Sequence, residues 1–237
     1  MANENLFDDK AEFYNARPNY PKECIDYLIG RLGLDSQSVI ADIGAGTGKL
    51  TLPFLHTVAF AYAVEPNDDM FGELQKNLSV FSNIKFMHSM AENTGIPQST
   101  CDAVVVGTAF HWFDKKEFFA ECKRILRDNK MVAILRISNN TDADKQLDRM
   151  WHHTEEDLQS AKAFLGDGFL EHVQFEYSEP FDEDRYIRFL LSSATAPTPG
   201  EERFKEYIEK CKTVYRKHFG DEIAHLPFVV NCFIGKM

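Results

Sequence analysis

A run of glycines follows a short apolar stretch in the first quarter of the chain. Residues 39–43 are apolar apart from Asp42, and Gly44, Gly46 and Gly48 come directly after them. Glycines allow a sharp turn and the close approach of a ligand to the main chain, and a following helix N-terminus offers unpaired N–H groups. This order of strand, glycine loop and helix predicts the binding site of a small cofactor.

The spacing of the glycines separates the kinds of nucleotide site that such a loop can form. The dinucleotide fingerprint Gly-x-Gly-x-x-Gly needs a third glycine one residue later than Gly48, where Lys49 stands. A phosphate-binding P-loop needs a hydroxyl residue after Gly-Lys, whereas Leu50 follows, and Ile43 occupies the place of its first glycine. NAD is therefore the weaker interpretation, and a P-loop is rejected.

An acidic residue ends the next apolar run. Glu65 lies 21 residues beyond Gly44 and directly after the run 59–64. A carboxylate at this place can accept hydrogen bonds from both hydroxyls of a ribose. Because NAD sites share this feature, Glu65 supports an adenosine-containing ligand without choosing among such ligands.

The elements that must position these residues alternate between helical and strand patterns from about residue 21 to residue 136. A helix is expected after Pro21 with its end near Gly33, and another after Asp114 as its N-cap. Runs that are apolar on both faces, as in buried parallel strands, lie at 39–43, 59–64, 84–87, 103–106 and 131–137. The alternation predicts an α/β fold with a mainly parallel sheet.

The pattern changes after residue 137. A long helix with an apolar stripe that reaches Leu165 follows a polar turn, and it is either a substrate-facing insertion or ordinary core. Further elements are expected as a strand at about 172–177, helices at 183–191 and 201–219, and a last strand at 228–234. We divide the chain into an N-terminal arm and helix (1–34), a cofactor-binding half (35–137), an insertion with strand 6 (138–200) and a C-terminal helix and last strand (201–237).

Composition limits the function. The 237 residues, 44% of them apolar, suit a single domain with one sizeable core. The net charge of −11 has the wrong sign for a protein that binds nucleic acid or an anionic membrane. Five widely spaced cysteines form no Cys-x-x-Cys pair, so we expect reduced thiols and no metal site. We find no signal-peptide or membrane-spanning pattern and expect a cytoplasmic protein.

Three ordered groups of residues resemble the motifs of class I S-adenosylmethionine-dependent methyltransferases: Asp42–Gly48, Val64–Pro66, and Ala91-Glu92 followed by Cys101–Val104. The resemblance covers roughly residues 35–136. The segments Ala109–Phe113 and Tyr14–Pro21 are similar to the small-molecule branch (type 11) that contains trans-aconitate methyltransferase. The resemblance implies a Rossmann-like sheet of seven strands with an antiparallel last strand, S-adenosylmethionine as cofactor and S-adenosylhomocysteine as product.

The resemblance also assigns residues to parts of the cofactor. Around the methionine end it places Asp42, Gly44, Ala45, Gly46 and Gly48; Glu65 would hold the ribose; and Pro66, Asn67, Ala91 and Glu92 would border the adenine. In many relatives an acid precedes the Ala-Glu pair and binds the adenine amino group, whereas Met90 stands here. Here the adenine amino group would instead be bound by the backbone or by Glu92.

Methyl transfer requires mainly that nucleophile, methyl group and sulfur be aligned and water excluded. If the acceptor is a hydroxyl, His111 is the candidate base, because imidazole titrates near neutrality; the alternative is that it only lines the pocket. Arg17 can pair with a carboxylate of cofactor or substrate. As residues of a lid or acceptor site we name Tyr14, Arg17, Trp112 and Trp151.

The favoured function is therefore methyl transfer to a small-molecule acceptor by in-line displacement. Two alternatives stay open: an NAD(P)-dependent oxidoreductase, and a non-catalytic relative that keeps the fold as a cofactor sensor or partner subunit. The sequence assigns neither the acceptor nor the oligomeric state.

Overall fold

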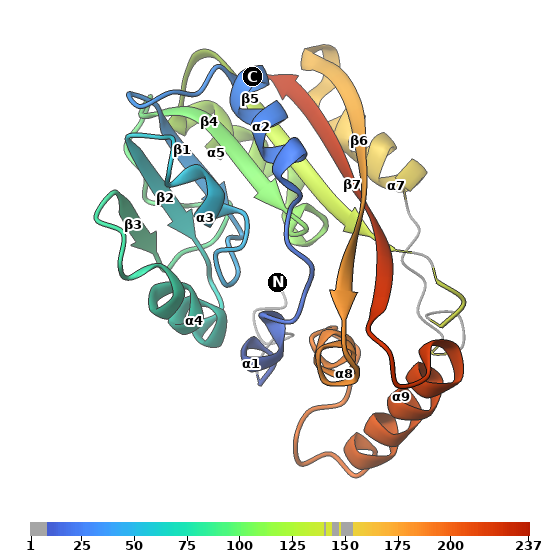
Figure 1. Cartoon of the computed structure of the whole chain (residues 1–237). Helices are drawn as coiled ribbons and strands as arrows, with labels where there is room; N and C mark the ends of the chain where they lie inside the picture. The colour runs from blue at the N-terminus through green and yellow to red at the C-terminus, as the bar shows by residue number, and fades with distance from the viewer. Residues whose placement is uncertain (1–8, 140, 144–146, 148–153) are drawn as a thin grey trace.

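A seven-stranded sheet with helices on both faces organises the chain (Figure 1). The computed structural model describes residues 9–139, 141–143, 147 and 154–237. The strand order is β3-β2-β1-β4-β5-β7-β6. The strands are β1 (Val39–Ile43), β2 (Phe60–Val64), β3 (Ile84–Met87), β4 (Cys101–Gly107), β5 (Leu126–Ser138), β6 (Phe169–Phe181) and β7 (Ala224–Lys236).

The direction of the strands agrees with the sequence pattern. The pairs β1–β2, β2–β3, β1–β4 and β4–β5 are parallel, and β7 runs antiparallel to both β5 and β6. Ile40 and Ala41 are both fully buried although they point to opposite faces of β1, as expected for strands covered on both sides. The predicted sheet with an antiparallel last strand is confirmed.

Helices on the two faces enclose two hydrophobic clusters. On one face α2 (Lys22–Leu32), α3 (Thr51–Phe54) and α4 (Asp68–Leu78) pack on the sheet, and on the other α5 (Lys115–Ile125) and α7 (Thr154–Leu165) do so. Gly33 ends α2 with φ of 64°, and the side chain of Asp114 caps α5 by accepting the N–H groups of Lys116 and Glu117. Both helix boundaries were predicted from these residues.

The described part of the expected insertion covers the sheet. The helix predicted with an apolar stripe up to Leu165 is present from Thr154 onward, and Trp151 lies outside the described residues. Phe164 of α7 stacks on Phe118 of α5 with ring centroids 5.4 Å apart, so α7 completes the core of this face. No helix within the described ranges has the length and apolar character needed to cross a membrane.

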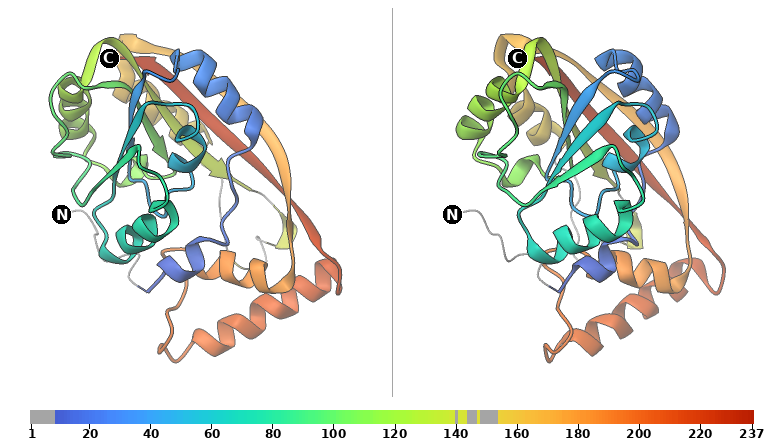
Figure 2. Two further views of the ribbon diagram at one scale, coloured as in Figure 1. Left: turned by 60° about the vertical axis from the view of Figure 1, so that its left-hand side comes forward. Right: turned by 90° about the vertical axis from the view of Figure 1, so that its left-hand side faces the viewer.

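A third hydrophobic cluster lies beyond the carboxyl ends of the strands. It joins α1 (Ala11–Tyr14), α8 (Glu183–Leu191), α9 (Phe204–Phe219) and the adjoining ends of β6 and β7 (Figures 1 and 2). We call this unit the cap. β6 and β7 are longer than predicted because they stay paired as far as Phe181 and Ala224, whereas the pairing of β5 with β7 ends at Ser138.

Candidate functional site

Two cavities adjoin at the end of the sheet that faces the cap. The arm cavity, of about 620 Å³, lies between the glycine loop, the N-terminal arm (residues 9–21) and the cap. The loop cavity, of about 790 Å³, lies between the ends of β1 and β2 and the segments that follow β3 and β4. Five residues line both cavities: Tyr14, Gly44, Gly46, Gly107 and Thr108. A ligand longer than either cavity can therefore occupy both.

The glycine loop turns at the shared wall. Gly44 and Gly46 have φ of 72° and 56°, a left-handed conformation that favours glycine. A Cβ at Gly44 would lie 2.5 Å from Cβ of Ala109. Gly48 lies outside both linings, and a Cβ there would lie 2.7 Å from Leu78 of α4. The first two glycines thus bring the backbone to the cavities, and the third allows close packing of α4.

Asp42, at the end of β1, is a buried carboxylate in the lining of the arm cavity. Its Oδ2 accepts a hydrogen bond of 2.6 Å from the Thr51 hydroxyl, while Oδ1 has no hydrogen-bond partner among the described residues. Burial raises the pKa of Asp42 to about 7, the Thr51 hydroxyl opposes this shift, and the charge of Glu65 adds to it. A buried acceptor atom without a partner fits a ligand that brings a positively charged donor.

Glu65 is held in a fixed orientation at the end of β2. Its Oε2 accepts the N–H of Gly46 at 2.9 Å, and its Oε1 accepts the N–H of Asn67 at 3.0 Å. Burial raises the pKa of Glu65, and the two backbone donors oppose that rise. Together with Pro66 and Asn67 it lines the loop cavity. Each oxygen keeps a second lone pair that a ligand hydroxyl can use.

The segment after β3 forms the opposite wall of the loop cavity through Met90, Ala91 and Glu92. Two contacts fix it to α5. Glu92 Oε1 accepts the N–H of Asp114, just before the helix, at 2.7 Å. Near the other end of the helix, Glu121 Oε1 accepts both the N–H and the hydroxyl of Thr94, at 2.8 and 2.5 Å.

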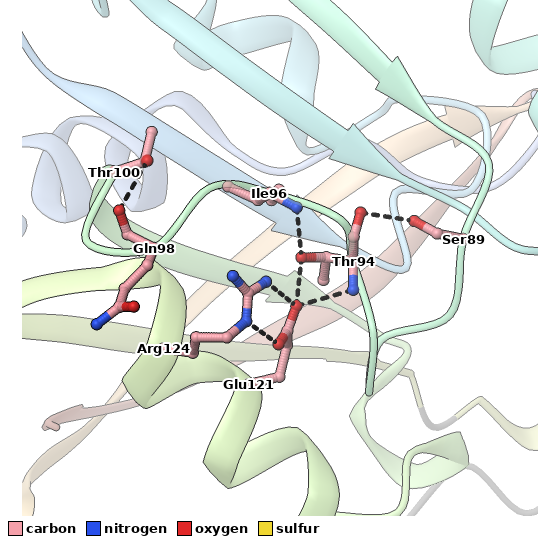
Figure 3. Close-up of polar contacts among 7 residues, drawn as sticks. All are labelled: Ser89, Thr94, Ile96, Gln98, Thr100, Glu121 and Arg124. Atoms are coloured by element: carbon pink, nitrogen blue, oxygen red, sulfur yellow. Dashed lines mark hydrogen bonds and ion pairs between the residues drawn. The ribbon is translucent and has the colours of Figure 1, made fainter.

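Figure 3 shows this second contact, which we call the Glu121 latch (Glu121, Thr94 and Arg124). Arg124 donates to both carboxylate oxygens of Glu121 at 2.7 Å. Glu121 is 6% exposed and Thr94 is fully buried. Because a buried charge is stable only when it is paired and hydrogen-bonded, the latch holds the segment in one position.

The N-terminal arm passes over the glycine loop. A Cβ at Gly46 would lie 3.6 Å from Cε1 of Tyr14. Arg17 donates to the Tyr14 hydroxyl at 3.1 Å and to the hydroxyl and carbonyl oxygens of Ser192, just after α8, at 2.9 and 2.8 Å. The arm and the cap are therefore connected at the arm cavity, which Arg17 lines.

His111 lies outside the linings of both cavities. Arg136 donates a hydrogen bond of 2.8 Å to its Nδ1. Although part of the ring is exposed, loss of surrounding water and the charges of Arg136, Lys115 and Arg17 lower the pKa of His111 to about 3. A neutral ring whose Nδ1 lone pair is occupied is poorly placed to accept a proton. The base role stays a prediction that this geometry does not support. Trp112, by contrast, lines the loop cavity.

Sequence reasoning missed several residues of the arm cavity. Tyr20 and Thr108 both line it, and the position of Thr108 shortly after the predicted strand 103–106 was a usable signal. Lys49 was weighed only against the dinucleotide fingerprint and the P-loop, and not as a residue of the acceptor site. Phe189 and Phe228 reach the cavity from the cap, and no local pattern indicates that position.

The comparisons with known proteins agree with this geometry. Residues 41–134 match the family model described as a methyltransferase domain. An uncharacterised methyltransferase of Schizosaccharomyces pombe is 28% identical over 94% of this chain and 93% of its own length. A Dictyostelium discoideum protein, provisionally named a methyltransferase, is 28% identical over 62% of this chain. That match spans 58% of the Dictyostelium protein.

The fold is similar to solved structures over nearly the whole chain. A structure described as a SAM-dependent methyltransferase from Aquifex aeolicus superposes with a TM-score of 0.57 at 14% identity, and covers 95% of this chain and 98% of its own. At this identity the likeness shows the fold alone.

Proposed function

Because this chain is a class I S-adenosylmethionine-dependent methyltransferase, we propose that it methylates a small-molecule acceptor bound in the arm cavity. The observation that carries the proposal is the pair of adjoining cavities that meet at the glycine loop. The loop cavity has the polar groups that an adenosine needs, and the arm cavity is bounded by the N-terminal arm and the cap. The acidic chain, with a net charge of −11, further disfavours a nucleic-acid acceptor.

The described residues fit S-adenosylmethionine at both of its ends. Asp42 Oδ1, buried and without a partner among the described residues, would accept the ammonium of the methionine end. The left-handed turns at Gly44 and Gly46 leave room beside the backbone. Glu65 would accept the ribose hydroxyls, and the adenine would lie among Pro66, Asn67, Met90, Ala91 and Glu92.

The chemistry requires positioning more than proton transfer. When bound, S-adenosylmethionine supplies a methyl group on a positively charged sulfur, and its displacement by the acceptor leaves S-adenosylhomocysteine. Tyr14, Gly107 and Thr108 surround the place where the cavities meet, and there they would align the acceptor and exclude water. If the acceptor loses a proton, that proton would pass to solvent, because we do not assign His111 the role of a general base.

The two alternatives receive less support. A nicotinamide cofactor needs room for a pyrophosphate at the glycine loop, and Lys49 stands where its fingerprint has the third glycine. A non-catalytic relative would bind the cofactor without turnover, and only an activity measurement separates it from an enzyme.

Calorimetric titration with S-adenosylmethionine, S-adenosylhomocysteine and NADH tests the proposal. We expect micromolar binding of the first two and none of NADH. Glu65→Ala should weaken binding about 100-fold, because two hydrogen bonds to a charged group are lost. Glu176→Ala, which removes an exposed carboxylate on β6, is the matched control and should bind normally.

Release of S-adenosylhomocysteine, measured over a panel of small acids, phenols and amines, then tests turnover. Binding without turnover of any acceptor would favour the non-catalytic relative. Binding of NADH alone would contradict the methyltransferase cofactor assignment.

A further inference from the structure

The arm cavity contains two positive side chains that have only neutral partners. Arg17 donates to Ser192 and to the Tyr14 hydroxyl, and Lys49 Nζ donates to Oδ1 of Asn19 at 2.9 Å. Within the described part of the chain, neither cation has a carboxylate at ion-pair distance. Both line the cavity, so a bound ligand can reach them.

Lys49 is the cation whose charge is less well compensated. It is half-buried, and loss of surrounding water lowers its pKa to about 8 although Glu179 opposes the shift. Glu179 is already occupied, because it accepts from the Arg185 guanidinium and from the N–H of Asn19. An ammonium in such a place is stabilised when a ligand brings a negative charge.

The cofactor has one carboxylate and can therefore form an ion pair with only one of the two cations. This step rests on the proposed function, in which Asp42 takes the ammonium of the methionine end. Arg17 would be the partner for the carboxylate of that end, because it is hydrogen-bonded to Tyr14, which lines both cavities over Gly46. With these pairs formed, Lys49 and the sulfonium would be the positive charges in the arm cavity without an ion-pair partner among the described residues.

We propose that the methyl acceptor carries an anionic group, such as a carboxylate, and that Lys49 binds it. Lys49 is then a residue that determines acceptor specificity. Phe189 and Phe228 from the cap line the same cavity, so the body of the acceptor is at least partly apolar. In this proposal the anionic group contributes to binding, and we do not assign which atom of the acceptor is methylated.

The test compares a carboxylate with its neutral counterpart. Benzoate and benzamide have nearly the same shape and differ in charge, so each is titrated by calorimetry into the protein saturated with S-adenosylhomocysteine. We expect the wild type to bind benzoate at least about ten-fold more tightly than benzamide, as for a charge-assisted hydrogen bond. Lys49→Met should abolish this preference, and Lys49→Arg should keep it.

Two controls separate the inference from loss of folding and from the proposed function. Lys116→Met removes an exposed lysine of α5 and should leave the preference unchanged. Lys49→Met should still bind S-adenosylhomocysteine like the wild type, which shows that the cofactor site is intact. Equal binding of benzoate and benzamide by the wild type, or an unchanged preference in Lys49→Met, would overturn the inference. Failure of the wild type to bind S-adenosylhomocysteine would instead overturn the proposed function.

Discussion

The two halves of the site are built in different ways. The side that would hold the cofactor comes from the ends of β1 and β2 and from the segments that follow β3 and β4, so each of the predicted cofactor-binding residues lies at a strand end or in the loop after one. The cap brings α1, near the start of the chain, together with α8 and α9, which come much later in the sequence, around one hydrophobic cluster. The first side therefore depends on backbone conformation, whereas the second depends on tertiary packing of side chains.

The largest effect is expected from Gly44→Ala on the cofactor side. The new Cβ would lie 2.5 Å from Ala109 and would need the left-handed conformation at φ of 72°. We expect a loss of about 2–4 kcal/mol in the free energy of unfolding. We also expect a fall of about 100-fold in affinity for S-adenosylhomocysteine. Chemical denaturation and calorimetry measure the two quantities.

Gly30→Ala, in the last turn of α2, is the matched control for that substitution. A Cβ there meets nothing within 4 Å, so stability should stay equal or rise by about 0.5–1 kcal/mol. If Gly44→Ala bound S-adenosylhomocysteine with wild-type affinity, binding would not depend on the left-handed backbone conformation at Gly44.

The difference between the two halves also explains what could be predicted from the sequence. Strands 39–43 and 84–87 are present with the predicted bounds, and the predicted carboxylates Asp42 and Glu65 lie at adjoining strand ends in the cavity linings. These features follow from local order, because the carboxyl ends of neighbouring parallel strands meet at one edge of the sheet.

The cap shows why the rest could not be predicted. The helix at 183–191 has its predicted bounds, yet its periodicity does not reveal that Phe189 reaches the arm cavity. That position depends on the long β6–β7 ribbon and on packing against Phe181 and Phe228. The predicted substrate-facing segment 138–200 contributes to the cavity through Ser138, Asn139 and Phe189, whereas α7 packs against α5.

A second test on the cofactor side concerns pH. The folded protein keeps the proton of Asp42 up to a pH of about 7, whereas an exposed aspartate loses it near its ordinary pKa of about 4. The contribution of Asp42 to the free energy of unfolding is therefore fully present below pH 4 and is lost as the pH rises through 7. Affinity for S-adenosylhomocysteine should change in the opposite sense, because the ammonium needs the carboxylate.

Below pH 7 that affinity should rise by up to about ten-fold per pH unit, and above pH 7 it should level off. Asp42→Asn should weaken binding and remove this slope, whereas Asp128→Asn, at an exposed site on β5, should keep it. Calorimetry at four pH values measures the slope. The same slope in Asp42→Asn would assign the titration to another group.

A substitution in the Glu121 latch tests a contact between two elements on the cofactor side. We expect it to change the Kd less than the substitutions above. Glu121→Gln removes the negative charge of the carboxylate to which Arg124 and Thr94 donate hydrogen bonds. We expect a loss of about 1–3 kcal/mol in stability and a several-fold rise in the Kd for S-adenosylhomocysteine. Glu117→Gln, on the exposed side of the same helix, should change neither. A loss of stability without any change in Kd would limit the latch to a structural role.

The smallest effect is expected in the cap. The buried Tyr215 hydroxyl lies 2.8 and 2.7 Å from the carbonyl oxygens of Phe181 and Glu222, which share its one proton, and so connects α9 to the ends of β6 and β7. Tyr215→Phe should reduce stability by about 1 kcal/mol. The Kd for S-adenosylhomocysteine should stay within about two-fold of the wild type, because the hydroxyl lies outside both cavity linings. A ten-fold rise in that Kd, measured by calorimetry, would mean that the cap and the cofactor side form a single cooperative unit. A change in cap packing would then reach the cofactor side through cap residues that line the arm cavity, such as Phe189 and Phe228.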